Sequence, residues 1–251
     1  MLNSPINRMG GKSRLRKKII SKLPKHICYV EPFFGAGWVY FGKDPSTVEV
    51  INDMDGDIVN LFRVIKEHPL EFERLINYEV ISRDKFIEYK NVNLAYLTDI
   101  QRAVRFLYIV SNSFASKGIS FGYTAMGKPG QKLFIENALE IRDRLKNTII
   151  ENKDVLDIIK RYDREKTFFF LDPPYINTTG YANKFTIEDH KRLNETLKQV
   201  KGKFLLTIND CDEARRIYKD FNIEEIKVGY SVAREREARK AYGELIISNY
   251  E

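Results

Sequence analysis

The stretch from Phe168 to Tyr175 (FFFLDPPY) constrains the fold of this chain more than any other. Its four apolar residues have high β propensity and predict a buried strand. The two prolines cannot donate to a strand ladder, so the strand must end there, with an acid and an aromatic ring on a stiff turn. In open α/β sheets, ligands bind at the carboxyl ends of the strands, so this turn is a candidate site. The alternative is a plain turn that only ends the strand.

A glycine turn follows a second predicted strand, near the N-terminus. His26–Val30 predicts the strand, and the chain continues as Glu31-Pro32-Phe33-Phe34-Gly35-Ala36-Gly37. Strand, glycine turn and short helix resemble a nucleotide-binding fingerprint, although the full G-x-G-x-x-G is absent. Gly35 and Gly37 would let the backbone approach a ligand closely.

The next predicted strand, Val48–Ile51, delivers Asn52 and Asp53 to its carboxyl end. Asp53 lies 16 residues beyond Gly37. An acid about 20 residues past such a glycine turn commonly binds ribose hydroxyls. These positions therefore predict a nucleoside pocket.

The middle of the chain follows a different pattern. Helical periodicity dominates from about residue 58, over 56–68, 70–78, 82–90 and 100–112. Residues 113–130 then form a stretch rich in glycine, serine and aromatic residues, which carries Lys117 and Lys128 without an acid. Long irregular loops in compact domains are usually functional or disordered, and the aromatic content argues against disorder. We expect an inserted module with a projecting recognition loop, the alternative being a loop packed on the preceding helices.

Strand and helix alternate again after residue 135, and the last two predicted strands, 223–228 and 244–249, flank a basic stretch at 230–242. The fold class predicted is α/β, a doubly wound Rossmann-like sheet that is mostly parallel, with one antiparallel strand near the C-terminus. We expect residues 1–57 and 136–251 to form the catalytic domain around an inserted, mainly helical module at 58–135. Asp154 precedes a helix, where it either caps the helix or contacts a ligand.

Composition narrows the classes of function. Two cysteines, Cys28 and Cys211, exclude a disulfide framework and indicate a reducing compartment. The three histidines and two cysteines show no metal-ligand spacing, so we expect no metal. No apolar run is long enough for a membrane span or a signal peptide. The net charge of +7 favours a polyanionic partner such as nucleic acid.

The residue types at the two strand ends suggest a reaction. No phosphate-binding lysine follows the glycines, so a nucleoside cofactor without phosphates, such as S-adenosylmethionine (AdoMet), fits better than ATP. The exocyclic amine of a base is a poor nucleophile because its lone pair is delocalised. Asp172 and a carbonyl of the Pro173-Pro174 turn could accept hydrogen bonds from the two N–H groups of this amine, while Tyr175 stacks on the base. The reaction is then an in-line methyl transfer to a flipped base.

These residues resemble the Dam-type DNA adenine-N6 methyltransferases. The matching stretches are Gly10-Gly11-Lys12, Glu31 to Gly37, Asn52-Asp53 and Asp172-Pro173-Pro174-Tyr175. The resemblance implies AdoMet as the methyl donor, Lys12 and Asp53 at the cofactor, and Asp172 with Tyr175 at the adenine. It also implies that the inserted module reads the sequence of the DNA. Arg8 departs from the family's namesake, which has an aromatic residue there, and the loop at 113–130 is too short and too weakly basic to carry over a recognition sequence.

We therefore expect an AdoMet-dependent DNA adenine-N6 methyltransferase that acts on double-stranded DNA. The predicted catalytic residues are Asp172, Pro173 and Tyr175. The predicted cofactor residues are Arg8, Gly10, Lys12, Glu31, Phe33, Gly35, Gly37, Asp53, Asp154 and Asp172. The predicted DNA contacts are Ser116, Lys117, Ser120, Tyr123 and Lys128.

Further expectations concern the setting of this activity. We expect a cytoplasmic protein, bacterial or phage-encoded, with no membrane partner and with a monomer as the working assumption. Amine methylation of RNA or of a protein glutamine is the alternative within the same chemistry. A DNA-binding homologue without catalysis is the alternative of another class. Neither cysteine follows a proline, which argues against cytosine-C5 methylation through a thiolate.

Overall fold

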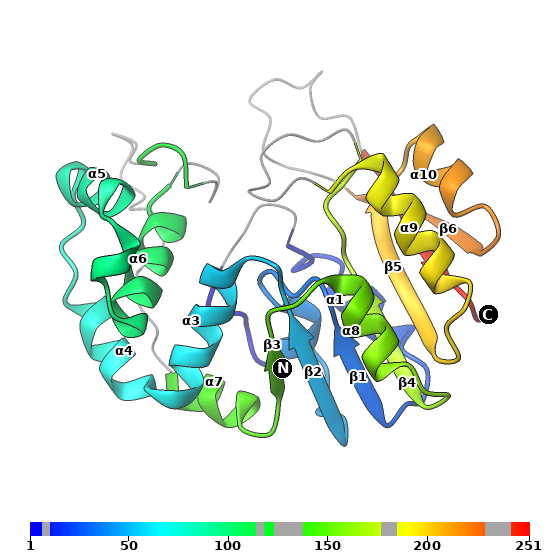
Figure 1. Cartoon of the computed structure of the whole chain (residues 1–251), viewed down its shortest axis with the longest axis horizontal. Helices are drawn as coiled ribbons and strands as arrows, with labels where there is room; N and C mark the ends of the chain where they lie inside the picture. Colours follow the sequence, from blue (N-terminus) through cyan, green and yellow to red (C-terminus); the bar gives the residue numbers. More distant parts are fainter. Residues whose placement is uncertain (7–10, 114–117, 123–137, 177–184, 229–241) are drawn as a thin grey trace. The chain divides into compact units, whose positions relative to one another are not determined.

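A computed structural model covers the chain, and it describes residues 1–6, 11–113, 118–122, 138–176, 185–228 and 242–251 (Figure 1). The chain divides into two compact units, which are described separately. One unit comprises Met1–Lys22, Phe34–Pro45 and Asp55–Asn152; the other comprises Leu23–Phe33, Ser46–Met54 and Lys153–Glu251. The predicted division into 1–57 with 136–251 around a module at 58–135 follows different boundaries and stays a prediction.

A twisted sheet forms the second unit. Its strands lie in the order β2-β1-β4-β5-β7-β6 and span β1 (Cys28–Glu31), β2 (Val48–Asn52), β4 (Thr167–Leu171), β5 (Lys203–Asn209), β6 (Asn222–Val228) and β7 (Tyr242–Ser248). β2, β1, β4 and β5 are parallel, whereas β7 runs antiparallel to both β5 and β6. The predicted α/β fold, mostly parallel with an antiparallel strand near the C-terminus, is confirmed.

The helices of this unit supply the other half of its core. They are α8 (Val155–Tyr162), α9 (Ile187–Leu197) and α10 (Asp212–Ile217). Ile158 of α8 and Leu193 of α9 are fully buried in one cluster with Phe169 and Leu206 from the central strands. α9 begins with a capping box, in which Thr186 and Asp189 satisfy each other's backbone N–H groups. The first turn of α9 is thereby stabilised.

The first unit is mainly helical. It contains α1 (Arg16–Ser21), α2 (Trp38–Gly42), α3 (Gly56–Glu67), α4 (Pro69–Asn77), α5 (Arg83–Asn91), η1 (Leu94–Tyr96), α6 (Asp99–Ser111), α7 (Ala138–Leu145) and the short strand β3 (Ile149–Glu151). The four helices expected between residues 56 and 112 are present, and α3 packs against α6. Asp55 caps α3 by accepting from the Asp57 N–H. Over the described residues, the helices are too short or too polar to cross a bilayer.

Candidate active site

The Asp-Pro-Pro-Tyr turn begins where the central strand of the second unit ends. β4 is buried over its whole length, and it pairs with β1 on one side and β5 on the other. Its ladder with β5 runs to Leu171, opposite Leu206. Asp172 follows, half-buried, and Pro173 then lacks the N–H that another rung would need. The pairing of β4 therefore fixes the backbone position from which the turn with Asp172 and Tyr175 begins.

Two polar side chains of β5 hold this turn. The Thr207 hydroxyl donates to Asp172 Oδ1 at 2.9 Å. Asn209 forms two hydrogen bonds with the backbone of Ile176: its Oδ1 accepts from the Ile176 N–H at 2.9 Å, and its Nδ2 donates to the Ile176 carbonyl at 3.2 Å. β5 thus orients the Asp172 carboxylate and also clamps the residue that follows Tyr175.

A buried histidine holds the middle of the turn. His190 of α9 places Nε2 3.1 Å from the Pro174 carbonyl and Nδ1 3.0 Å from the Tyr218 hydroxyl. A carbonyl only accepts, so Nε2 carries the proton and Nδ1 accepts from Tyr218. Burial lowers the pKa of His190 to about 4, which keeps the ring neutral at neutral pH. Because Pro174 is held in this way, the Pro173 carbonyl is the better candidate for a substrate amine.

The tyrosine of the turn is held by a third strand. The Tyr175 hydroxyl donates to Glu244 Oε1 at 2.7 Å. Glu244 lies at the beginning of β7 and is 3% exposed, whereas Tyr175 is half-buried. The ring that is predicted to stack on a base is therefore attached to a buried carboxyl group through its hydroxyl.

Two acids lie at the carboxyl ends of the neighbouring strands β1 and β2. Glu31 ends β1, is buried, and accepts from the Tyr29 hydroxyl at 2.6 Å. It pairs in register with Ile51, so the half-buried Asp53 follows two residues later on the adjacent strand. Between them, the Asn52 amide donates to the Pro32 carbonyl at 3.0 Å. This places both predicted cofactor acids at the ligand-binding edge of the sheet.

The other predicted cofactor residues of this unit lie close to the same edge. Phe33 packs edge-on against Phe185, which in turn packs edge-on against His190. Asp154 is exposed and caps α8 by accepting from the Leu156 N–H at 2.8 Å. The capping role is thus observed, and a ligand contact by Asp154 stays a prediction.

Gly35 and Gly37, the two glycines of the predicted glycine turn, lie in the first unit and differ in what surrounds them. Both have a left-handed backbone, with φ of 50° at Gly35 and 65° at Gly37. A Cβ on Gly37 would lie 2.4 Å from the Phe34 ring, so this glycine is required by packing. Among the described residues, a Cβ on Gly35 would meet nothing within 4 Å, which is compatible with a close approach of a ligand. Lys12, also in this unit, is 5% exposed.

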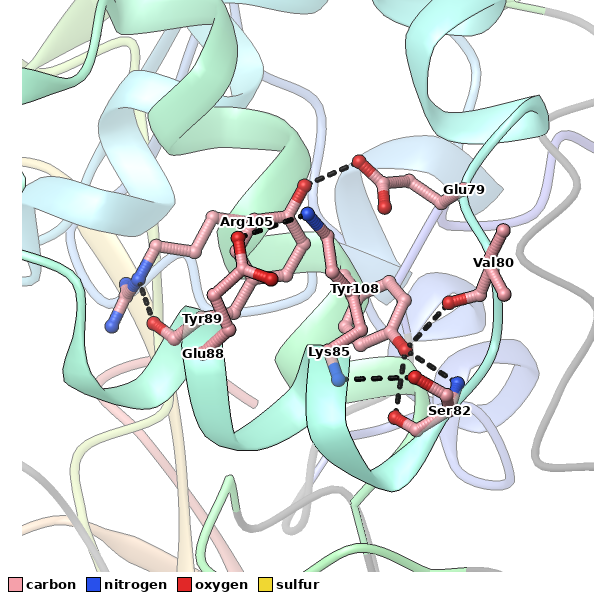
Figure 2. A network of polar contacts seen from close by, with 8 residues as sticks. All are labelled: Glu79, Val80, Ser82, Lys85, Glu88, Tyr89, Arg105 and Tyr108. Carbon is pink, nitrogen blue, oxygen red and sulfur yellow. Dashed lines mark hydrogen bonds and ion pairs between the residues drawn. The ribbon is translucent and has the colours of Figure 1, made fainter.

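Within the module predicted to read DNA, a polar network joins α5, α6 and the connection between α4 and α5 (Figure 2). The Tyr108 hydroxyl on α6 accepts from the Ser82 N–H at 3.0 Å and lies 3.0 Å from the Val80 carbonyl. The Tyr89 hydroxyl donates to the Glu79 carboxylate, and Arg105 donates to the Tyr89 carbonyl. Burial is the main reason why the pKa values of both tyrosine hydroxyls are raised. The connection between α4 and α5 is therefore tied to α6.

The described part of the predicted recognition loop, residues 118–122, rests on α5. Phe121 packs edge-on against Phe86 and lies under the Arg83 guanidinium. Lys90 donates to the Ile119 carbonyl at 2.6 Å. Ser120 is exposed between these two anchored residues. Arg8, Gly10, Ser116, Lys117, Tyr123 and Lys128 lie outside the described residues.

Sequence reasoning did not select Thr207, His190, Tyr218 or Glu244. Thr207 offered one signal, because it lies near the carboxyl end of the apolar stretch that forms β5, where ligand-binding residues of α/β sheets are found. Glu244 and His190 offered none, since an acid in a predicted strand and a lone histidine in a predicted helix are usually structural. In the part of the chain that the structure describes, no group of three or more histidine, cysteine or acidic side chains could hold a metal ion.

Comparison with known proteins identifies the family. The family model for D12 class N6 adenine-specific DNA methyltransferases matches residues 9–232, which is most of the chain. The chain belongs to this family of DNA methyltransferases. The match includes the glycine turn, the Asn52-Asp53 pair and the Asp172 turn, and it confirms the predicted class of enzyme.

Named relatives of the D12 methyltransferase extend over nearly the whole chain. It is 28% identical to the Type II methyltransferase M1.LlaDCHI of Lactococcus lactis subsp. cremoris, over 96% of this chain and 93% of that protein. It is 26% identical to the DNA adenine methylase of Escherichia coli (strain K12), over 94% of this chain and 91% of that protein. Among solved structures, a methyltransferase named SMU.472, complexed with SAH, matches 95% of this chain and 52% of its own, at 13% identity and a TM-score of 0.41.

Proposed function

We propose that this methyltransferase transfers a methyl group from AdoMet to N6 of an adenine that is flipped out of double-stranded DNA. The observation that carries the proposal is the Asp172 turn. Its carboxylate, its second proline and its tyrosine are each held by a separate element, through Thr207, His190 and Glu244. A site that works by positioning requires such support, because small displacements of the acceptors lower the rate strongly.

The residues present fit a nucleoside cofactor. Glu31 and Asp53 supply two carboxylates at the ends of adjacent parallel strands, which suits the hydroxyls of a ribose. Gly35 combines a left-handed backbone with open space at its Cβ position. We assign AdoMet to Glu31 and Asp53, while the cofactor contacts of Gly35 and Lys12 stay predictions from the sequence. When bound, AdoMet would supply an electrophilic methyl group.

The chain's own groups prepare the adenine. The Asp172 carboxylate and the Pro173 carbonyl accept hydrogen bonds from the two N–H groups of N6 and draw the amine toward tetrahedral geometry. The lone pair of nitrogen then becomes available for an in-line attack on the methyl carbon. As the N–C bond forms, the methyl–sulfur bond of the donor would break with its electron pair left on sulfur, and the cationic N6 would lose one proton to water. Tyr175 stacks on the base and holds it out of the duplex.

One experiment tests this function. The protein is incubated with methyl-labelled AdoMet and with separate pools of duplex DNA, RNA and protein. We expect label only in duplex DNA, as N6-methyladenine after enzymatic digestion, and sequencing of the treated DNA then maps the site.

The other readings predict other outcomes of the same assay. Label in RNA or in protein glutamine would replace the proposal with amine methylation of that substrate. DNA binding without label in any pool would indicate a homologue that has lost catalysis.

A further inference from the structure

The buried acid Glu244 reaches the substrate edge of the sheet because of the direction of its strand. Parallel strands bring their last residues to that edge, whereas an antiparallel strand brings its first. β7 is antiparallel to β5, and Glu244, its third residue, lies opposite Asn209 at the end of β5. On the other side, Glu244 lies opposite Ile226.

The backbone around Glu244 is fixed by close packing. The Asp210 N–H donates to the Gly243 carbonyl at 2.8 Å. A Cβ on Gly243 would lie 2.8 Å from the Asp210 Cβ, so only glycine permits this approach of β7 to the end of β5. The Glu244 side chain therefore starts from a position that the sheet determines.

We propose that Glu244 is a positioning residue for the methyl transfer, and that it fixes where the Tyr175 ring lies against the flipped adenine. This inference rests on the proposed function. The Tyr175 hydroxyl oxygen lies on the axis of the Cβ–Cγ bond, so the hydrogen bond to Glu244 Oε1 restricts rotation about the Cα–Cβ bond and thereby fixes the direction in which the ring points. Burying a carboxyl group is costly unless it is hydrogen-bonded, and here the Tyr175 hydroxyl donates to it.

A double-mutant cycle tests the link. The variants are Tyr175→Phe, Glu244→Leu and both together, with kcat and KM measured on a duplex that carries the mapped site. Each single variant should lower kcat about tenfold, the rate equivalent of one hydrogen bond, with KM for AdoMet unchanged. The double variant should lose no more than Glu244→Leu alone, because the hydrogen bond is already absent once either partner is changed.

Two further variants separate positioning from stability. Glu244→Gln keeps an oxygen that accepts from Tyr175, so its kcat should stay within about twofold of wild type. Glu225→Gln removes an exposed acid of β6 that pairs with Arg215, and it should leave kcat unchanged. Active-site titration corrects every rate for unfolded protein, so a purely structural role of Glu244 would leave the corrected kcat as it was.

The outcomes distinguish this inference from the function on which it rests. A wild-type protein that does not methylate adenine in DNA would refute the proposed function. An active wild type with losses that multiply to about a hundredfold would refute the role of Glu244 alone. If Glu244→Leu does not fold, an unchanged kcat in Tyr175→Phe would still overturn the inference.

Discussion

At the scale of single residues, the Asp172 carboxylate has the interaction that should strengthen most toward the transition state, as the amine becomes tetrahedral. We predict that Asp172→Ala lowers kcat by at least about 100-fold while AdoMet and DNA still bind. Thr207→Val, which removes only the hydroxyl that orients Asp172, should cost about fivefold. Single-turnover methylation measures both rates, and full activity of Asp172→Ala would refute the mechanism.

Asp53 belongs to the cofactor side of the site. A hydrogen bond from a ribose hydroxyl to a carboxylate is worth about 1.5–3 kcal/mol, so Asp53→Ala should weaken AdoMet binding about 10- to 100-fold. Calorimetric titration measures this affinity. Asp44→Ala is the matched control, because Asp44 is an exposed acid that precedes the same strand. Equal affinity in all three proteins would remove Asp53 from the cofactor site.

At the scale of elements, α5 holds residues 118–122 of the predicted recognition loop, and this loop is predicted to read DNA. Ser120 is exposed between Ile119 and Phe121, and α5 fixes both of these neighbours. Changing Ser120, Ser116 or Tyr123 to alanine should relax the preference at one position of the site, by about 1–3 kcal/mol per lost contact. Sequencing of methylated DNA gives the preference for each variant.

Lysines of the same loop should behave differently. Lys117→Ala and Lys128→Ala should weaken binding to all duplexes and flatten its salt dependence, because phosphate contacts carry no sequence information. If all five variants keep the wild-type site and the wild-type duplex affinity, the reading of bases must be assigned elsewhere, first to the basic stretch at 230–242.

The elements were predictable where the signal is local. FFFL before two prolines predicted β4 and its end, and the acids after β1 and β2 followed from the same rule. The supports of the turn were not predictable, because Thr207, His190 and Glu244 reach it only through strand order, register and helix packing. The antiparallel strand was expected, but not that its first residues would lie beside the turn. The assignments of individual residues to AdoMet and DNA remain predictions.

At the scale of the whole molecule, His190 links stability to pH. Its pKa is about 4 in the folded protein and about 6.5 in an unfolded chain, because burial penalises the charged ring. Above pH 6.5 both states are neutral and the group has no effect. As the pH falls below 6.5, His190 becomes protonated in the unfolded chain but stays neutral in the folded protein. The free energy of unfolding therefore decreases until about pH 4, where the folded protein is also protonated.

The expected loss is about 2 kcal/mol at pH 5 relative to pH 7.5, and about 3 kcal/mol at pH 4. Other groups also titrate in this range, so the measurement is a difference. The free energy of unfolding in urea is compared for wild type and His190→Gln at both ends of the range. Gln can still donate to the Pro174 carbonyl but does not titrate. The free energy of unfolding of His190→Gln should therefore fall less than that of the wild type, by about these amounts. Parallel pH profiles for the two proteins would contradict the assignment.

The pairing of Val228 with Tyr242 has a consequence for how this enzyme can diversify. The last residue of β6 and the first residue of β7 are paired with each other. The pairing of the two strands therefore holds the two ends of their connection together. Doubling the length of such a connection costs only about 0.6 kcal/mol, and it changes no rung of the sheet. Insertions here would leave Glu244 opposite Asn209, because the ladder sets that register. This junction is therefore a natural point for grafting new nucleic-acid specificity onto an unchanged methyl-transfer core.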